Sequence, residues 1–254
     1  MHPDWLRPDW SVPPRVGAVM TTRAGGASTG PYASMNLGAW VGDDPAAVTA
    51  NRQRLQDACG GWIPLLKQVH GTNVVRLEDL GGDDRPVEAD ACLATTPGRV
   101  CAVTVADCLP VLFADREGRG VAAAHAGWRG LAGGVLDRTV DALCAAVGGR
   151  PEALVAWLGP CIGPRAFEVG EDVVHAFTPH APRPDRFVPS TPAGDGSPRW
   201  LADLPGLARD RLQRLGVAAA TGGDHCTVSD PSRFFSYRRD GVTGRMAAAV
   251  WLAP

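Results

Sequence analysis

Lysine is almost absent from this chain of 254 residues: Lys67 is the only one, so nearly every basic residue is an arginine. Schiff-base chemistry on a lysine amine therefore has a single candidate. Paired hydrogen bonds from arginine to carboxylate or phosphate groups have many candidates. The net charge of -2 lacks the basic excess that a nucleic-acid partner requires, so we expect no nucleic acid among the main partners.

Long apolar runs are also missing, because no stretch approaches the roughly 20 apolar residues of a membrane-spanning helix. The first ten residues, MHPDWLRPDW, have neither the basic segment nor the apolar core of a signal peptide. We therefore expect a cytoplasmic protein with no membrane partner. Seven cysteines, an odd number, fit the reducing cytosol. Four of them stand in apolar surroundings and are expected to be core residues: Cys92, Cys101, Cys144 and Cys161.

Several nucleotide-binding and metal-binding motifs are absent. No strand is followed by GxGxxG and a helix, and no Walker loop is present, which argues against a Rossmann fold and a P-loop site. There is no HExxH or CxxC pair. The chain also shows no internal repeat and no shift of composition. We expect one domain over residues 1–254, with an α+β fold in which mixed β-sheets form a sandwich.

Hydrophobic periodicity predicts the elements of this fold. Strands are expected at residues 16–20, 69–77 (interrupted at 70–72), 90–95, 100–106, 109–114, 121–125, 154–158 and 246–252. Helices are expected from 44 to about 59, and at 131–147, 171–177 and 200–215. Residues 178–199 are rich in Pro, Gly and charge and are expected to form a mobile surface loop. The two strands on either side of residues 115–120 are predicted to form an antiparallel hairpin.

Three polar interruptions of apolar segments are predicted to meet. His125 ends the small-residue run GVAAAHAGWRG, Cys108 follows Asp107 where a buried strand breaks, and His70 stands in QVHG. The hairpin brings the break at Cys108 beside His125. Two imidazoles and one thiolate suit Zn²⁺ with an open fourth position, and Cu²⁺ is a second option.

Two other interpretations of these residues remain open at this stage. The histidines could be structural, or Cys108 and His125 could form a metal-free nucleophile pair of the hydrolase type. Asp107 could orient a histidine or cap a turn, and we count it with Cys108 and His125 as a catalytic candidate.

Anion-binding candidates lie in loops flanked by Gly or aromatic residues: Arg23, Arg129, Arg238 and Arg239. Each could equally be a solvated surface arginine. The Gly-rich loop that begins at residue 21 continues through Asn36 without periodicity, which favours a binding function for Asn36 as well. Trp128 or Phe235 could stack on a flat ring, or both could be core residues.

Long motifs extend over nearly the whole chain: TTRAGGASTGPYASMNLG, QVHGTNVV, VADCLPVLFAD, AAHAGWRG, GPCIGPRAFEVGEDV and FFSYRRDGVTGR. With these motifs the sequence resembles the YfiH family, also called the multicopper polyphenol oxidase or laccase-domain family, which includes bacterial purine nucleoside phosphorylases. The family's metal ligands correspond to His70, Cys108 and His125. The resemblance implies an α/β/β/α layer order, related to a Cys/His-type hydrolase fold.

The resemblance also implies an activity. It is zinc-dependent phosphorolysis of adenosine, inosine, guanosine and methylthioadenosine to the base and ribose 1-phosphate, with adenosine deamination as a second reaction. Purine nucleosides and phosphate are then the partners, and we expect a monomer. Two alternatives are implied by other names of the family: a copper-dependent phenol oxidoreductase, and a cell-wall precursor editing hydrolase with Cys108 as nucleophile. One departure, Ala208 and Arg211 where relatives tend to have Asn and Gln, puts a peripheral contact in doubt.

Overall fold

The computed structural model describes residues 1–81, 85–180 and 184–254. Its helices are α1 (Pro45–Cys59), α2 (Trp128–Gly133), α3 (Val135–Val147), α4 (Glu171–Phe177), α5 (Leu204–Arg214) and α6 (Tyr237–Asp240). Its strands are β1 (Val16–Met20), β2 (Leu66–Lys67), β3 (Val74–Arg76), β4 (Val87–Glu88), β5 (Ala91–Ala94), β6 (Val100–Val105), β7 (Leu109–Asp115), β8 (Val121–Ala126), β9 (Leu154–Leu158), β10 (Glu168–Val169), β11 (Phe187–Ser190), β12 (Arg199–Ala202), β13 (Ala219–Gly222) and β14 (Met246–Leu252). Among these described residues, no helix has both the length and the apolar character needed to cross a bilayer.

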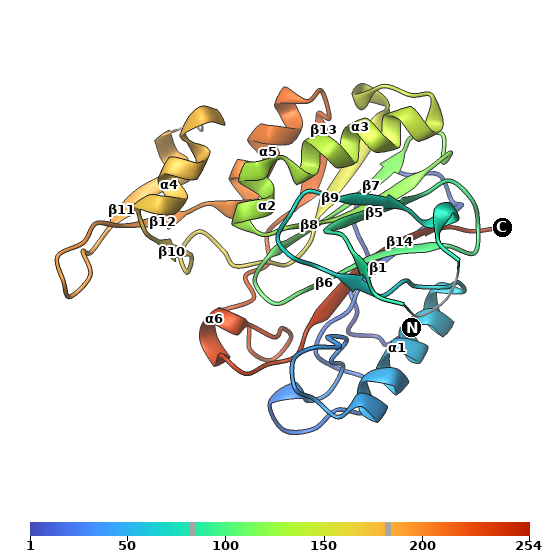
Figure 1. Ribbon diagram of the computed structural model, residues 1–254, viewed down its shortest axis with the longest axis horizontal. Coiled ribbons are helices and arrows are strands. Elements are labelled where there is room, and N and C mark those ends of the chain that lie inside the picture. Colours follow the sequence, from blue (N-terminus) through green and yellow to red (C-terminus); the bar gives the residue numbers. More distant parts are fainter. Residues whose placement is uncertain (82–84, 181–183) are drawn as a thin grey trace.

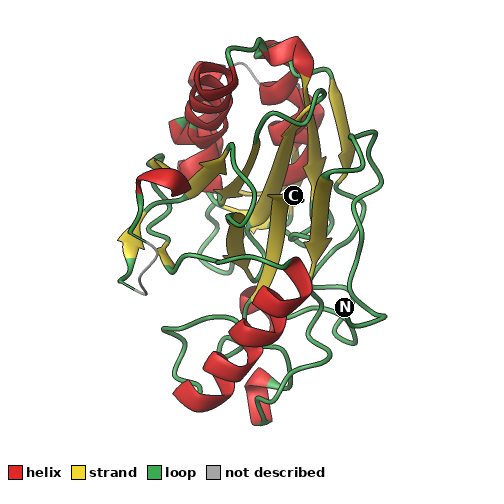
Figure 2. Ribbon diagram, turned by 90° about the vertical axis from the view of Figure 1, so that its right-hand side faces the viewer, coloured by secondary structure: helices red, strands yellow, loops and turns green. Residues whose placement is uncertain are grey.

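Two β-sheets pack face to face at the centre of the molecule (Figure 1). The larger sheet has the order β13-β9-β7-β8-β5-β3, with parallel pairs at its two ends and antiparallel pairs between them. The smaller sheet, β1-β14-β6, is antiparallel. Helices α2, α3 and α5 lie over the outer face of the larger sheet, whereas α1 lies on the opposite side of the molecule (Figure 2). The predicted α+β fold with mixed sheets and α/β/β/α layers is confirmed.

Strand β7 shows how the sequence builds these layers. Its residues Leu109, Val111 and Phe113 pack toward the helices, whereas Leu112 and Ala114 pack toward the smaller sheet. Successive side chains of a strand point to opposite faces, so an uninterrupted apolar run is what a strand covered on both sides requires. All seven residues of β7 are buried. The predicted hairpin of β7 and β8 is confirmed.

The predicted helix at 131–147 is wrong as a single element, because it is divided into α2 and α3. Gly134 separates the two with a φ of 98°, in the left-handed region that an L side chain rarely adopts. The periodicity continues on both sides of this residue, so the hydrophobic pattern alone did not show the break.

The mobile loop predicted at 178–199 is also wrong where the structure describes it, because β11 pairs with β12 in an antiparallel hairpin. Residues 181–183 lie outside the described residues. The predicted helix at 200–215 begins only at Leu204, since Asp203 caps it by accepting a hydrogen bond from the Gly206 N–H at 2.9 Å. Arg186, which the carboxylates of Asp203 and Asp210 bind at 2.6 to 2.9 Å, holds the hairpin to α5.

The strand predicted at 69–77 is shorter than expected. Only Val74–Arg76 forms β3, and His70 adopts a left-handed turn with a φ of 61°. Three of the four cysteines expected in the core, Cys92, Cys101 and Cys161, are buried, whereas Cys144 is half-buried at the edge of the core.

A buried amide on α1 anchors the polar loop that precedes this helix. The Asn51 side chain accepts a hydrogen bond from the Ala27 N–H at 2.7 Å. Its amide nitrogen lies 3.0 Å from the Ser28 hydroxyl and 3.1 and 2.9 Å from the carbonyl oxygens of Ser34 and Asn36. Asn51 is fully buried, so water cannot replace these partners if it is removed.

We therefore expect Asn51→Ala to lower the free energy of unfolding by about 2 to 4 kcal/mol, because several buried polar groups lose their partner. Urea unfolding followed by circular dichroism measures this loss. Gln53→Ala, on the exposed side of the same helix, is the control and should stay within about 0.5 kcal/mol of the wild type. Equal stability of the two variants would contradict the anchoring role of Asn51.

Candidate metal centre and its cavity

His70, Cys108 and His125 come together where three segments meet. His125 lies near the end of β8, Cys108 directly precedes β7, and His70 lies in the turn between β2 and β3. One ligand atom from each side chain lies within 4.8 Å of the other two. The Cys108 Sγ atom is 3.7 Å from His70 Nε2, and the two imidazole rings are 4.8 Å apart at an angle of 73°. The three side chains that the sequence predicted to converge thus form one group.

Burial is uneven across this group. The His125 side chain is almost inaccessible, with 3% of its residue surface exposed, whereas Cys108 is half-buried and His70 is exposed. All three also line one cavity. The group therefore has a closed side within the sheets and an open side toward the cavity.

The carboxylate of Asp90 holds both imidazoles in place. One oxygen lies 2.8 Å from His125 Nδ1. The same carboxylate accepts backbone hydrogen bonds from Val69, His70 and Gly71 at 3.2, 2.9 and 2.7 Å, which maintains the turn that carries His70. A buried carboxylate behind a histidine fixes the ring and leaves the other nitrogen, Nε2, for a ligand. The sequence pattern did not point to Asp90, although this residue precedes a buried strand in the segment ADACLATTPG.

Gly127 leaves space for the group. A Cβ atom at this position would lie 2.9 Å from both Cys108 Sγ and His70 Cδ2. Any side chain at residue 127 would therefore displace one of these two side chains. The glycine of HAGWRG is thus a steric requirement of the site.

Electrostatics favour the thiolate form of Cys108. Burial raises the pKa of the Cys108 thiol, but the charges and hydrogen bonds of His125 and His70 outweigh it and lower the pKa to about 6. Burial likewise lowers the pKa of His125, and the opposing effects of Cys108 and Asp90 raise it to about 9. Without a metal the pair is therefore a thiolate and an imidazolium at pH 7. A thiolate is also the form in which cysteine binds metal.

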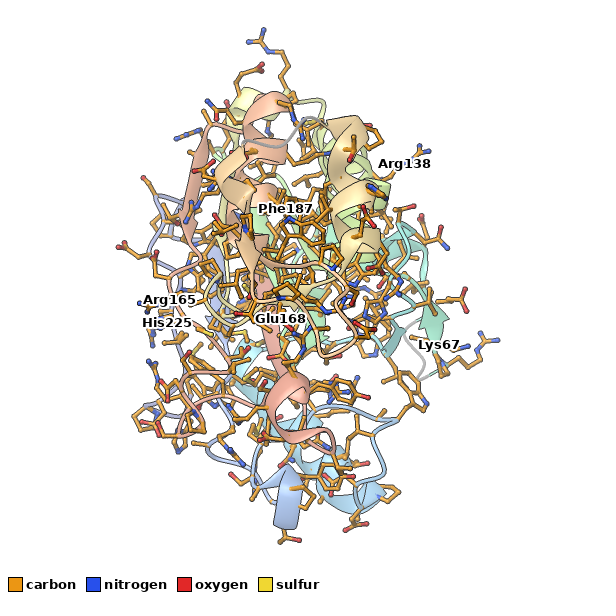
Figure 3. The ribbon with its side chains drawn as sticks, turned by 90° about the vertical axis from the view of Figure 1, so that its left-hand side faces the viewer. Lys67, Arg138, Arg165, Glu168, Phe187 and His225 are labelled. Atoms are coloured by element: carbon orange, nitrogen blue, oxygen red, sulfur yellow. The ribbon has the colours of Figure 1, made fainter. Side chains whose placement is uncertain are left out.

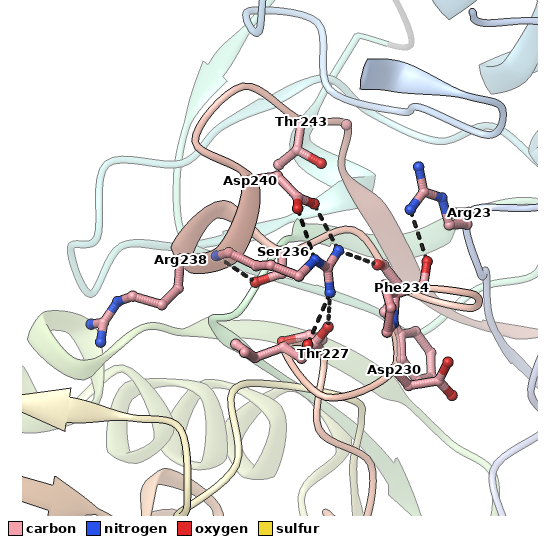
Figure 4. Close-up of polar contacts among 12 residues, drawn as sticks. Arg23, Thr227, Asp230, Phe234, Ser236, Arg238, Asp240 and Thr243 are labelled. Atoms are coloured by element: carbon pink, nitrogen blue, oxygen red, sulfur yellow. Dashed lines mark hydrogen bonds and ion pairs between the residues drawn. The ribbon is translucent and has the colours of Figure 1, made fainter. Parts of the chain in front are cut away.

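Asp107 contacts the loops around the site and not the two histidines. Its carboxylate accepts hydrogen bonds from the hydroxyl groups of Thr227 and Ser236, at 2.5 and 3.0 Å, and from the Arg238 backbone N–H at 2.7 Å. Both carboxylate oxygens are occupied, and the residue has a φ of 93°. Figure 4 shows Thr227, Phe234, Ser236 and Asp240 of the loops that these contacts fix. The Arg239 guanidinium donates to the carbonyl oxygens of Thr227 and Phe234 and to the Asp240 carboxylate. This geometry suits a positioning residue.

The arginines selected from the sequence do not line the cavity. Arg23 donates to the carbonyl oxygens of Ala33 and Pro231, at 3.0 and 2.8 Å. The Arg129 guanidinium lies over the ring of its neighbour Trp128, 4.1 Å from the ring centroid. Their predicted phosphate contacts stay predictions.

Arg238 and Asn36 are also engaged elsewhere. Figure 4 shows the Arg238 guanidinium extended away from the loop, and it donates to the Glu168 carbonyl oxygen at 2.9 Å. Asn36 is fully buried, and its amide nitrogen donates to Asp43 at 2.9 Å. Phe235 is fully buried in the core, and Trp128 packs against the core, so neither ring lines the cavity.

The cavity has a volume of about 470 Å³, within the range of small-molecule sites. Its wall includes residues 37–41, 63–66, 102 and 104–106, together with Tyr237, Arg245 and the His/Cys/His group. Trp40 and Tyr237 line it although 58% and 60% of their surfaces are exposed. Large exposed aromatic side chains beside a cavity suit recognition of a flat ring.

Two arginines line the cavity, and the sequence analysis selected neither. Arg52 donates to the carbonyl oxygens of Ile63 and Pro64 at 3.3 Å. Arg245 ends the motif FFSYRRDGVTGR, and its Nη1 atom donates to the carbonyl oxygens of Thr243 and Gly244 at 3.0 Å. Burial lowers the pKa of Arg245, and the opposing effects of the nearby Cys108 and Asp107 do not offset it. The motif could have indicated Arg245 as a cavity residue, because it contains this arginine. However, the spacing of the motif does not distinguish Arg245 from Arg238 and Arg239.

The donor set fits a metal ion. Imidazole and thiolate groups both bind zinc, and catalytic zinc sites combine three such protein ligands with an open fourth position. One imidazole has the carboxylate partner that such sites use, and the open side faces a cavity large enough for a substrate. The group could thus hold a metal ion and present it to a bound molecule.

We expect Cys108 to react with iodoacetamide at a rate that rises with pH around a midpoint near 6 in the metal-free protein, because the thiolate is the nucleophile. Burial raises the pKa of Cys59 to about 12 and also raises those of Cys101 and Cys161. Mass spectrometry of labelled peptides measures the rate of this reaction. The Cys226→Ala background removes a second thiol, because Cys226 is half-buried and its pKa is lowered although burial alone would raise it. A midpoint above 8 for Cys108 would show that the histidines do not activate it.

We expect Gly127→Ala to weaken metal binding by at least about tenfold, since its Cβ atom would displace Cys108 or His70. Competition with a chromogenic zinc chelator measures the affinity. Gly194→Ala is the matched control, because a Cβ atom there meets nothing within 4 Å. Unchanged affinity in Gly127→Ala would mean that these two side chains are not ligands of one ion.

Comparisons with known proteins show relatives that match this chain over nearly its whole length. A purine nucleoside phosphorylase of Pseudomonas aeruginosa is 52% identical over 249 residues, which cover 98% of each chain. The purine nucleoside phosphorylase YfiH of Escherichia coli is 50% identical, over 96% of this chain and 97% of the relative. A crystal structure of a Neisseria meningitidis protein superimposes with a TM-score of 0.90 at 49% identity, covering 99% of this chain and all of the other.

A more distant structure, YlmD from Geobacillus stearothermophilus, has a TM-score of 0.85 at 31% identity, over 98% of this chain and 96% of the other. The family model described as multi-copper polyphenol oxidoreductase laccase matches residues 17–253. The chain therefore belongs to this laccase-domain family, also known as the YfiH family.

Proposed function

We propose that this protein is a zinc-dependent purine nucleoside phosphorylase. It would convert adenosine, inosine, guanosine and methylthioadenosine to the free base and ribose 1-phosphate, with adenosine deamination as a second reaction. The observation that carries the proposal is the His/Cys/His group in the wall of a cavity of about 470 Å³ that exposed aromatic rings also line. Relatives at 52% and 50% identity are named purine nucleoside phosphorylases, which supports the choice of substrate.

His70, Cys108 and His125 would hold the zinc ion, which would act as a Lewis acid on a bound oxygen atom. Copper could also occupy these ligands. Asp90 keeps the His125 ring in the orientation that leaves Nε2 free. Asp107 positions the loop that carries Arg238 through its contacts with Thr227 and Ser236, which supports a positioning role for this residue.

The cavity residues would orient the nucleoside. The purine would stack on Trp40 or Tyr237, both of which expose their rings beside the cavity. In phosphorolysis an oxygen of hydrogen phosphate forms a bond with C1′ of the ribose, while the bond from C1′ to the purine nitrogen breaks. The base takes the electron pair of that bond, and the proton that the hydrogen phosphate gives up. In deamination, water and adenosine give inosine and ammonia.

The test is to incubate purified protein of known metal content with adenosine, with and without phosphate, and to resolve adenine, inosine and hypoxanthine by chromatography. We expect adenine that depends on phosphate, and about one zinc ion per chain. Inosine formed without phosphate would report the second reaction.

His70→Ala, Cys108→Ala and His125→Ala should each lose both zinc and phosphorolysis, by at least about a hundredfold in rate. His175→Ala is the matched control, because this exposed histidine does not line the cavity and pairs with Glu171 in its own helix. Full phosphorolysis in any of the three ligand variants would overturn the zinc role. Oxygen uptake with a phenol and copper, in a protein that forms no purine product, would favour the oxidoreductase alternative. Hydrolysis of a cell-wall precursor that is lost on thiol alkylation without metal dependence would favour the Cys108 nucleophile.

A further inference from the structure

Arg245 stands out among the cations of the cavity because part of its guanidinium is free. Its Nη1 atom is occupied by the carbonyl oxygens of Thr243 and Gly244. Its Nε and Nη2 atoms have no hydrogen-bond partner among the described residues, although the residue lines the cavity together with Cys108 and His125. An arginine stays charged at every physiological pH, so its free N–H groups can bind an anion there.

The backbone around Arg245 is fixed before any ligand arrives. The Arg245 N–H donates to the side-chain oxygen of Asn36 at 2.8 Å, and its carbonyl oxygen accepts from the Leu37 N–H at 2.9 Å. A Cβ atom on Gly38 would lie 2.7 Å from Arg245 Cγ, so the glycine makes room for this side chain. The guanidinium also lies over Tyr237, 5.7 Å from the ring centroid. Asn36 thus acts as a positioning residue for Arg245.

We propose that Arg245 binds the phosphate that enters this cavity, through its free Nε and Nη2 groups. Paired N–H groups on one guanidinium match two phosphate oxygens. The site lies in the cavity wall shared with the metal ligands, where a bound phosphate would be held beside the nucleoside. This inference rests on the proposed phosphorylase function for its ligand, but phosphate binding can be measured without turnover.

The experiment is calorimetric titration of inorganic phosphate into the zinc-loaded protein, for the wild type, Arg245→Gln and Arg245→Lys. We expect Arg245→Gln to lose at least about tenfold in phosphate affinity, and Arg245→Lys to lose less, because lysine keeps the charge but not the paired donors. In the phosphorolysis assay the KM for phosphate should rise by a similar factor, while the KM for adenosine stays within about twofold.

The matched control is Arg138→Gln, which removes one positive charge from the surface of α3. Figure 3 shows Arg138 extended outward from the helical layer, and the residue does not line the cavity. This variant should bind phosphate as the wild type does. Thermal unfolding shows whether each variant is folded. If Arg245→Gln does not fold, the phosphate affinity of Arg245→Lys is compared with that of the wild type, and this comparison tests the inference.

Wild-type phosphate affinity in a folded Arg245→Gln or Arg245→Lys variant would overturn the inference, as would a wild-type protein that binds no phosphate. Phosphate binding that depends on Arg245, in a protein that splits no nucleoside, would support the anion site and reject the phosphorylase function. A failure of the phosphate site can thus be distinguished from a failure of the phosphorylase function.

Discussion

The hydrogen bonds of one buried carboxylate determine the geometry of the site. Asp90 is completely buried, and its oxygens bind the ring of His125 and three consecutive backbone N–H groups of residues 69–71. The burial of Asp90 raises its pKa, but the hydrogen bonds from His125 and Gly71 outweigh that effect and lower it. The carboxylate is therefore charged, and a left-handed turn at His70 is stable because a negative group satisfies its donors.

The two sheets supply the remaining constraint. Because β7 and β8 pair in antiparallel register, Pro110 lies opposite His125, and Cys108 comes just before the paired segment. The core on both faces of these strands leaves little freedom for either side chain to move. Two candidate ligands, Cys108 and His125, are thus held by the sheet at the start of β7 and within β8, whereas His70 depends on a turn that Asp90 holds.

Much of this arrangement could be predicted from the sequence, because it follows from local patterns. Strands β1, β9 and β14 have the bounds that their apolar runs predict. The start of α1 follows from the pair Asp44-Pro45, because Asp caps a helix and Pro suits its first turn. The hairpin of β7 and β8 also brings Cys108 near His125 by short-range pairing.

What could not be predicted depends on contacts between distant segments. Asp90 acts on residues some 20 and 35 positions away. All three arginines Arg238, Arg239 and Arg245 donate to backbone carbonyl oxygens, but only Arg245 of the three also lines the cavity. This difference depends on how the chain folds and not on the spacing of the motif. The break at Gly134 also lacks a local signal, because the hydrophobic periodicity continues on both sides of it. The hairpin of β11 and β12 lacks one as well, because its segment is rich in Pro, Gly and charged residues, which predict a loop.

The division of the cavity wall has a consequence for how the family can diversify. The candidate metal ligands belong to the central sheet and its adjoining turn, whereas Tyr237 and Arg245 belong to one short segment near the end of the chain and Trp40 to a loop near its start. Substitutions in these two segments would change the cavity wall and leave the candidate ligand set in place. The shape of this cavity can therefore change through a few loop residues, without rebuilding the centre of the fold.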